Sequence, residues 1–371
     1  MKARFVEHAV SILLVTALFV GLISLIQQEN LKKRTEQRSD IQKYLALEFV
    51  DFGNPLDRAL FRESLNIFFP DTPAGNDSLL RAIDDFRREQ FTNEMYKTGG
   101  AERGLTFAKT QELLGMFLQF IIIYVVVLAL SYYGAQTLGI IRFVHMKQGR
   151  SSYLASFLEH ISTSVNGNRS VPQAVVLLVK ALVKGMAYIV LFAPAYVIAY
   201  SFKTRFDTDS YFFMILLGVI SNGLLINYTN RFFTFLVSES RKGYVETAVV
   251  KNLYNSYLWH AGDGIAKSSV FRLRKKFPSH VFQHIYLNAR HQFQPTLKEH
   301  ASFLITGLVI IEMALNIQGH LSYEMLKNIL YKQYDVVLAI VLSIFLLVKA
   351  TEIAVDLWTY RQERKFGNKE V

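Results

Sequence analysis

The sequence predicts an all-α integral membrane protein with about six transmembrane helices and a small extracytoplasmic cap. Of its 371 residues, 51% are hydrophobic and only 19% are charged, whereas a soluble chain usually carries about 25% charged residues. The Lys and Arg residues crowd the ends of apolar stretches, so the formal charge of +11 indicates a membrane protein rather than a nucleic-acid partner. Because cysteine is absent, disulfides, thiolate metal sites and a Cys nucleophile are excluded.

Six apolar stretches approach the roughly 20 residues that a helix needs to cross a hydrocarbon core of about 30 Å. The first has no small-residue cleavage site after it, so we expect an uncleaved anchor and not a secretory signal peptide. The fifth is short, and it crosses only if its helix begins nearer to Pro295 or tilts little. The expected spans are Ala9–Ile26, Leu113–Ile141, Lys184–Phe202, Tyr211–Tyr228, Ser302–Ile317 and Tyr334–Asp356.

The distribution of basic residues predicts the orientation of these spans. Lys and Arg gather before the first span, between the second and third, between the fourth and fifth, and after the sixth. With six crossings all four segments lie on one side, which the positive-inside rule makes cytoplasmic. We therefore expect a multi-pass protein of the bacterial inner membrane with both termini in the cytoplasm.

This topology divides the chain into three parts. Residues 1–27 form the N-terminal anchor, 28–112 an extracytoplasmic domain, and 113–371 the membrane core, which includes a basic cytoplasmic loop at 231–300. Turn signals such as Gly53-Asn54-Pro55 punctuate the extracytoplasmic part. Within it, Ser78–Phe91 is predicted to be an amphipathic helix, because apolar residues recur at helical spacing: Leu79, Leu80, Ile83 and Phe86.

A segment after the fourth span carries a family resemblance. It reads Tyr244-Val-Glu-Thr247-Ala248-Val-Val-Lys251-Asn252-Leu253. It resembles the coupling segment of permease subunits in the dipeptide/oligopeptide/nickel branch of ABC importers, where the pattern is Tyr-Val-x-Thr-Ala-x-x-Lys-Gly-Leu after a basic transmembrane end. Two later stretches agree with the same family in order and position, so that the resemblance covers about half of the chain: Val309–Gly319, with Glu312 at the family's Glu, and Asp335–Trp358.

The resemblance implies the fold of a type I ABC importer permease that moves peptides or similar small solutes. It also implies a second, related permease subunit, cytoplasmic ATP-binding subunits, and a periplasmic solute-binding protein that contacts the cap. Alternating access needs a rigid element that carries ATPase motion into the membrane. The residues at this contact would be Tyr244, Thr247, Ala248, Lys251, Asn252 and Leu253. An ordinary amphipathic loop helix is the plainer interpretation of the same spacing.

Three features depart from the family. Asn252 replaces the family's Gly, which is tolerable because Asn accepts left-handed backbone geometry better than most residues. The Pro-Gly-Asp-Pro pattern after the first span is missing. The cytoplasmic loop Tyr254–Glu299 is longer than in the family and strongly basic at Arg272–Lys276. This basic run is most simply explained as a contact with anionic membrane lipids.

Acidic residues within the spans are candidates for function, because a carboxylate in a bilayer is costly. Glu312 either forms structural hydrogen bonds at a helix end or lines a solute pathway. Glu352 and Asp356 share a helical face with Lys349, and an ion pair with snorkelling explains them without function. Three amides of the fourth span are expected to join helices by hydrogen bonds: Asn222, Asn227 and Asn230.

No catalytic motif is evident, so the chain is not expected to be an enzyme or to bind a cofactor, and ATP hydrolysis would belong to other subunits. His280, His284 and His291 share one helical face, and a metal site is conceivable. No carboxylate accompanies them at a metalloprotease spacing, which favours a solvated or lipid-surface helix. The alternative function is a permease-derived scaffold that no longer transports and anchors an envelope complex. A secondary transporter is less favoured because no inverted repeat is evident.

Overall fold

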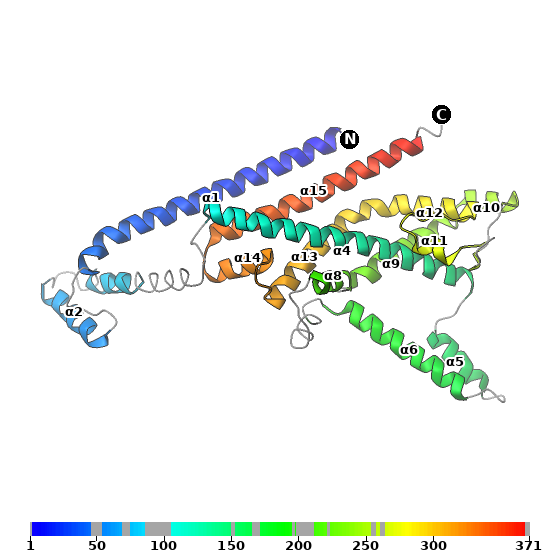
Figure 1. Ribbon diagram of the computed structural model, residues 1–371, viewed down its shortest axis with the longest axis horizontal. Coiled ribbons are helices and arrows are strands. Elements are labelled where there is room, and N and C mark those ends of the chain that lie inside the picture. Colours follow the sequence, from blue (N-terminus) through cyan, green and yellow to red (C-terminus); the bar gives the residue numbers. More distant parts are fainter. Residues whose placement is uncertain are drawn as a thin grey trace. The chain divides into compact units, whose positions relative to one another are not determined.

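The structure is a computed structural model that describes residues 2–45, 54–68, 75–85, 105–149, 153–164, 171–194, 197, 211–220, 223–253, 257–259 and 264–367. Within these ranges every regular element is a helix and no strand is present (Figure 1). The all-α class predicted from the sequence is therefore confirmed.

Four of the helices are long and apolar enough to cross a membrane, which makes the chain a multi-pass membrane protein. They are α1 (Lys2–Leu45), α4 (Phe107–Lys147), α6 (Val171–Phe192) and α15 (Tyr334–Gly367). A fifth candidate is the pair α8 (Tyr211–Ile220) and α9 (Leu224–Glu239), which bends by 47° at its break and can be counted as one span.

The predicted fifth span corresponds to α13 (Leu297–Leu315), which is not among these candidates. Its 19 residues reach about 28 Å, but Lys298, Glu299 and Glu312 interrupt its apolar character. The helix begins directly after the 3-10 turn Gln294–Thr296, and so nearer to Pro295 than to the predicted start at Ser302. The six spans expected from the sequence thus remain a prediction.

The third predicted span also differs in its position. The candidate span of α6 runs from Gln173 to Phe192, so it starts before the predicted Lys184. Lys180 and Lys184 lie inside the helix instead of preceding it, because the apolar run of Val and Leu residues before them continues the helix. Long Lys side chains can bring their charge to the membrane interface from such positions.

Two helices are about twice as long as a bilayer core requires. The 44 residues of α1 and the 41 residues of α4 extend over about 66 and 62 Å, against a core of about 30 Å. Part of each helix must therefore project from the hydrocarbon region. The predicted end of the anchor at residue 27 falls inside α1, which continues to Leu45.

The chain divides into two compact units. One contains residues 13–115 and 327–342. In it, α2 (Pro55–Phe68) packs against a helix over residues 75–85, with Leu65, Leu80 and Ile83 buried. An ion pair between Arg58 and Asp84 joins the two helices. The helix predicted over Ser78–Phe91 thus forms in part, while Phe86 lies outside the described residues.

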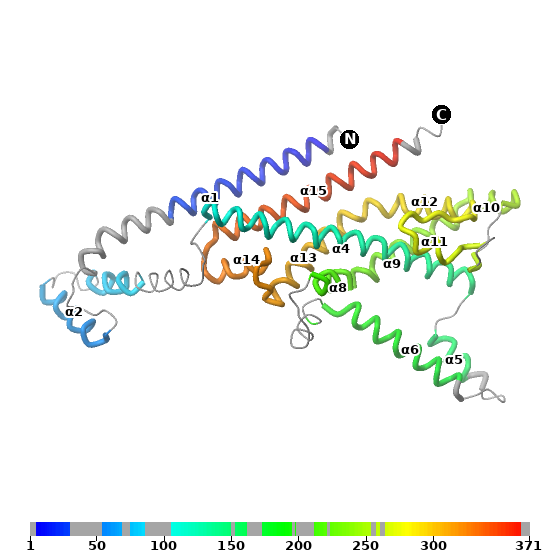
Figure 2. Tube along the Cα trace, in the orientation of Figure 1, coloured from blue at the N-terminus to red at the C-terminus, as the bar shows by residue number. Residues whose placement is uncertain are grey.

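The other unit contains residues 1–12, 116–326 and 343–371. Its core is aromatic: Phe232 of α9 packs edge-on against Phe293 and Tyr286 of α12 (His280–Phe293) at 5.1 and 6.3 Å between ring centroids. Phe143 of α4 stacks on Phe282 of α12 at 5.8 Å. In the same unit, α5 (Tyr153–Ser164) and α6 form a helical hairpin (Figure 2).

A glycine allows α4 and α9 to approach closely. A Cβ atom on Gly139 would lie 2.7 Å from Cδ1 of Phe232 and 3.4 Å from the backbone oxygen of Thr229. Small residues commonly mediate such contacts between membrane helices. Nearby, Arg142 of α4 donates a hydrogen bond to Asn230 of α9, so Asn230 joins two helices as the sequence predicts.

Candidate coupling segment and membrane groove

The predicted coupling residues lie together on a short surface helix. α10 (Gly243–Val250) follows α9 after the tight turn at Ser240–Lys242. Val245 is its one buried residue, while the Val250 side chain is 85% exposed. A helix of eight residues with an open outer face is available to a partner. The six predicted positions are Tyr244, Thr247 and Ala248 within α10 and Lys251, Asn252 and Leu253 at its C-terminal end.

Asn252 adopts the left-handed conformation that the family's glycine suggests, with φ of 54°. The Asn252 N–H donates to the oxygen of Val249 at 2.9 Å, and the Leu253 N–H donates to the oxygen of Ala248 at 3.0 Å. This pair of hydrogen bonds is a Schellman motif, which ends a helix by satisfying its last carbonyl groups. The left-handed backbone geometry that makes Asn acceptable at this position is therefore present.

A buried carboxylate, Glu239, connects α10 to the rest of the protein. Glu239 ends α9 with no exposed surface. It accepts a hydrogen bond from the Tyr244 hydroxyl at 3.1 Å, pairs with Lys242, and accepts from the Gln292 amide of α12. Charge-assisted hydrogen bonds such as these are among the strongest in proteins. Three elements therefore meet at one side chain, so a displacement of α10 acts on α9 and α12 together.

The sequence interpretation did not select Glu239. The available signal was a carboxylate three residues before Lys242 and five before Tyr244, within a turn that follows a span. The contact with Glu239 also affects the pKa of Tyr244. Burial raises the pKa of the Tyr244 hydroxyl to about 12, a hydrogen bond from Asn288 lowers it, and the Glu239 charge raises it. Tyr244 is therefore protonated at physiological pH and remains a donor to Glu239.

A groove of about 470 Å³ lies between α9 and α13. Its lining combines apolar residues with polar ones, and Arg231 of α9 forms an ion pair with Glu299 of α13 at one end. Exposed polar side chains follow the groove on both helices, at the helical spacing that places them on one face: Asn227, Arg231, Thr234 and Ser238 on α9, and Glu299, Ser302 and Thr306 on α13.

This line of polar residues contrasts with the outer face of α6, where the exposed side chains include Leu182, Val183 and Ile189. Thr234 and Thr306 bond to backbone oxygens of their own helices and could tolerate lipid. Asn227 and Arg231 are costly in a hydrocarbon environment, and such groups normally face water or protein. The α9–α13 groove therefore combines Asn227 and Arg231 with exposed apolar side chains such as Phe303.

Glu312 lies at the opposite end of α13 and is fully buried. Its carboxylate accepts a hydrogen bond from the Ser322 N–H at 2.9 Å and lies 3.2 Å from Nδ1 of His320. Ser322 is in the first turn of α14 (Leu321–Leu330), where backbone N–H groups lack partners within the helix. Glu312 thus joins the end of α13 to the start of α14, as expected if it forms structural hydrogen bonds at a helix end. It does not line the α9–α13 groove.

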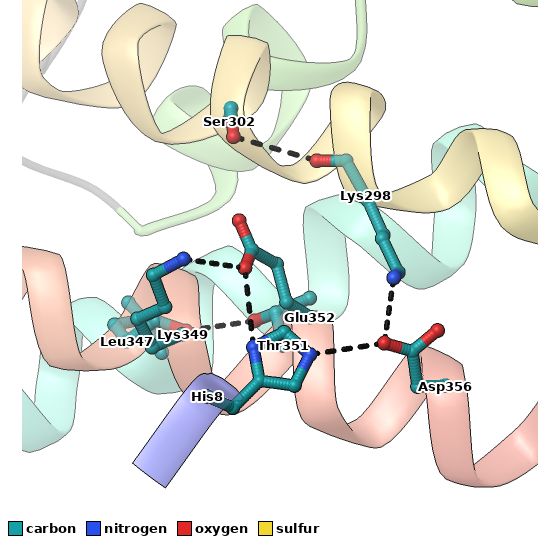
Figure 3. Close-up of polar contacts among 8 residues, drawn as sticks. All are labelled: His8, Lys298, Ser302, Leu347, Lys349, Thr351, Glu352 and Asp356. Carbon is teal, nitrogen blue, oxygen red and sulfur yellow. Dashed lines mark hydrogen bonds and ion pairs between the residues drawn. The ribbon is translucent and has the colours of Figure 1, made fainter. Parts of the chain in front are cut away.

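The other two predicted intramembrane carboxylates form part of an ion-pair cluster (Figure 3). Asp356 pairs with Lys298 of α13 at 2.6 Å and with His8 of α1 at 3.0 Å. Glu352 pairs with Lys349 one turn earlier at 2.8 Å and lies 3.7 Å from His8. The Lys349–Glu352 pair agrees with the sequence interpretation. The contacts of Asp356 join α1, α13 and α15, which sequence spacing along one helix could not reveal.

Other predicted groups have different environments. Asn227 lines the groove, and Asn222 lies outside the described residues. His280 and His284 are exposed neighbours with ring centroids 4.5 Å apart, and no metal-binding group of three side chains occurs in the described parts of the chain. The other face of α12 packs against protein, with Phe282, Tyr286 and Phe293 buried. Of the two interpretations of this stretch, a solvated helix or a lipid-surface helix, the exposed His280 and His284 agree with a solvated face, while the apolar residues of the helix pack in the protein core.

Comparisons with known proteins provide no family assignment. No family model matches the chain, and no curated protein matches it. What the described residues establish is a helical, multi-pass membrane protein, with four candidate spans among them, or five when α8 and α9 are counted as one.

Proposed function

We propose that this chain is a permease subunit of an ABC transporter, which moves peptides or similar small solutes across the bacterial inner membrane. The main observation in support is that one helix, α9, contributes both to the candidate solute groove and to the candidate ATPase contact. Its Asn227 and Arg231 line the groove, and its last residue, Glu239, bonds to Tyr244 of α10. The resemblance of Tyr244–Leu253 to the coupling segment of these permeases supports the same function.

The mechanism follows from this connection. An ATP-binding subunit that grasps α10 pulls on Glu239 through Tyr244 and Lys242. Since α9 is a continuous helix from Leu224 to Glu239, the displacement reaches the wall of the groove, where the Arg231–Glu299 pair bridges α9 and α13. Separation and closure of these helices would alternately expose a solute pathway. A second, related permease would complete that pathway, and a solute-binding protein would deliver solute at the extracytoplasmic cap.

The scaffold alternative also has a structural argument. In the described part of the long loop after α10, α12 packs on α9, so this part presents a surface that the family's shorter loops lack. A scaffold would keep α10 and the groove without needing an ATPase. The two functions therefore differ in their partners.

Purification of the chain from native membranes tests the proposal. Recovery of an ATP-binding subunit and a second permease is expected, and recovery of envelope proteins without any ATPase would favour the scaffold. Two variants extend the test: Ala248→Trp and Lys251→Glu should abolish solute uptake while membrane insertion persists. Arg361→Glu is the matched control, because Arg361 is an exposed basic residue on α15 outside the predicted coupling positions, and it should leave uptake unchanged.

Substituted cysteines test the groove separately, since the natural chain has none. Asn227→Cys and Thr306→Cys should react with a charged, membrane-impermeant thiol reagent, and solute should protect them. Ile189→Cys is the lipid-facing control, because the Ile189 side chain on α6 is 72% exposed. This cysteine should remain unreactive. Equal reactivity at all three positions would show that the groove has no special access to water.

A further inference from the structure

The segment Phe271–Lys276 starts at the last residue of α11 (Lys267–Phe271) and exposes both apolar and basic side chains. The Phe271 side chain is 61% exposed and the Leu273 side chain is 93% exposed. Arg272, Arg274 and Lys276 are exposed between and beside them. None of these three cations forms an ion pair with a described residue. The loop therefore offers two free apolar groups surrounded by three positive charges.

Lys275, in the middle of the same run, does the opposite and points into the protein. Its ammonium group donates to the Thr137 hydroxyl at 2.9 Å and to the Val270 oxygen at 2.6 Å, and it lies 4.1 Å from the centre of the Tyr133 ring. The Tyr133 hydroxyl also donates to the oxygen of Phe271. These contacts fasten the loop to α4 and hold its remaining side chains outward.

The position of the contact along α4 places the loop near a membrane surface. The polar start of α4 ends with the Lys109–Glu112 ion pair. A crossing of about 20 residues that begins at Leu113 ends at Tyr132, which lies within the longer apolar stretch Leu113–Ile141 expected from the sequence. Tyr132 packs against Trp358 of α15 at 5.9 Å, and Tyr and Trp are enriched at membrane interfaces. Tyr133 and Thr137 follow within about 8 Å along the axis, which is the depth of the lipid headgroups.

We propose that Phe271–Lys276 is a lipid-binding loop that inserts Phe271 and Leu273 among acyl chains and binds the phosphate groups of anionic lipids through Arg272, Arg274 and Lys276. Exposed apolar side chains next to basic ones are the combination that favours binding at an anionic interface. The sequence attributed lipid contact to the whole basic run. The structure reassigns Lys275 to fastening the loop, and it adds the two apolar residues. The inference does not depend on transport activity.

Spin labels on the purified full-length chain test this inference. Leu273→Cys carries one label, and Val250→Cys on the exposed face of α10 carries the water-facing control. Each is reconstituted in vesicles of phosphatidylcholine alone or mixed with phosphatidylglycerol, and collisions with oxygen and with a polar nickel chelate are compared. The Leu273 label should meet oxygen severalfold more, and the chelate severalfold less, than the Val250 label. Anionic lipid should increase the difference.

Reversal of the three outer charges (Arg272→Glu, Arg274→Glu, Lys276→Glu) should return the Leu273 label to water without unfolding the protein, since none of them is buried. A label at Leu273 as accessible to the chelate as the label at Val250 would overturn the inference. So would a label shielded from both reagents, because that result indicates a protein partner. Wild-type protein should also retain more phosphatidylglycerol through purification than the charge-reversed variant, and equal retention would likewise contradict the inference.

Discussion

The Tyr244 hydroxyl lies 3.1 Å from a carboxylate oxygen of Glu239 and donates a hydrogen bond to it. The two residues belong to different helices, because Glu239 ends α9 and Tyr244 lies in the first turn of α10. Glu239 is fully buried, whereas the Tyr244 side chain is 39% exposed. Tyr244 therefore connects the exposed surface of α10 with the buried end of α9.

Tyr244→Phe should impair coupling more than stability. The change removes one hydrogen bond, worth about 1 kcal/mol, while Lys242 and Gln292 continue to hold Glu239. We expect normal insertion, a small fall in unfolding temperature and a marked loss of solute uptake. Tyr360→Phe is the control, because Tyr360 is similarly exposed at 42% and lies on α15. Equal uptake by the two variants would mean that this hydrogen bond does not transmit motion.

Substitutions at Glu312 distinguish its two possible roles. Glu312→Leu leaves the Ser322 N–H and His320 without their acceptor and should destabilise the protein by about 1 to 3 kcal/mol. Glu312→Gln keeps an acceptor and should cost less. Uptake per folded molecule should remain close to normal for Glu312→Gln, measured together with thermal unfolding in detergent. Lost uptake at unchanged stability would instead place Glu312 in the solute pathway.

Gly139→Val should disrupt the contact between α4 and α9. The Cβ atom alone would lie 2.7 Å from the Phe232 ring, and overpacking of this kind costs about 1 to 3 kcal/mol. Gly185→Val in α6 is a matched control, because nothing lies within 4 Å of a Cβ atom there and both substitutions have the same effect on helix propensity. Thermal unfolding in detergent should show a lower midpoint for Gly139→Val than for Gly185→Val, and the reverse order would refute the contact.

Lys275 should make stability depend on pH under alkaline conditions. Burial, with the nearby Arg290 charge, lowers the pKa of its amine from 10.5 to about 8 in the folded protein. Between these pH values the unfolded chain binds the proton more tightly than the folded one, so the free energy of unfolding rises with pH. The wild-type protein should gain thermal stability from about pH 8 to pH 10 relative to Lys275→Met. Parallel curves for the two proteins would show that the amine is not perturbed.

The sequence predicted the elements whose signal is local. Apolar length identified α1, α4 and α15, and the tolerance of Asn for left-handed geometry agreed with the end of α10. Residues whose partners are distant in sequence were less accessible to prediction. Glu239 and Asp356 acquire their roles from Gln292, Lys298 and His8, which no periodicity relates to them. Lys275 differs from its basic neighbours only because Tyr133 and Thr137 lie beneath it.

The bend between α8 and α9 and the position of α6 have similar causes. Hydropathy locates an apolar run but does not detect the 47° bend between α8 and α9. α9 begins directly after Gly223, whose φ is 66°. Hydropathy also assigns Lys180 and Lys184 to a loop, because both are charged. The apolar residues around them nevertheless continue one helix. Boundaries near charged residues are therefore the part of the topology that sequence patterns fix least well.

A photo-crosslinking residue at Val250, a position of α10 that is 85% exposed, provides the most direct examination of the proposed function. After irradiation of native membranes, mass spectrometry of the adduct identifies what α10 contacts. A cytoplasmic ATP-binding subunit should be the principal adduct, and it should be lost with Ala248→Trp. An adduct with an extracytoplasmic protein would place α10 on the other side of the membrane and contradict its role as the ATPase contact.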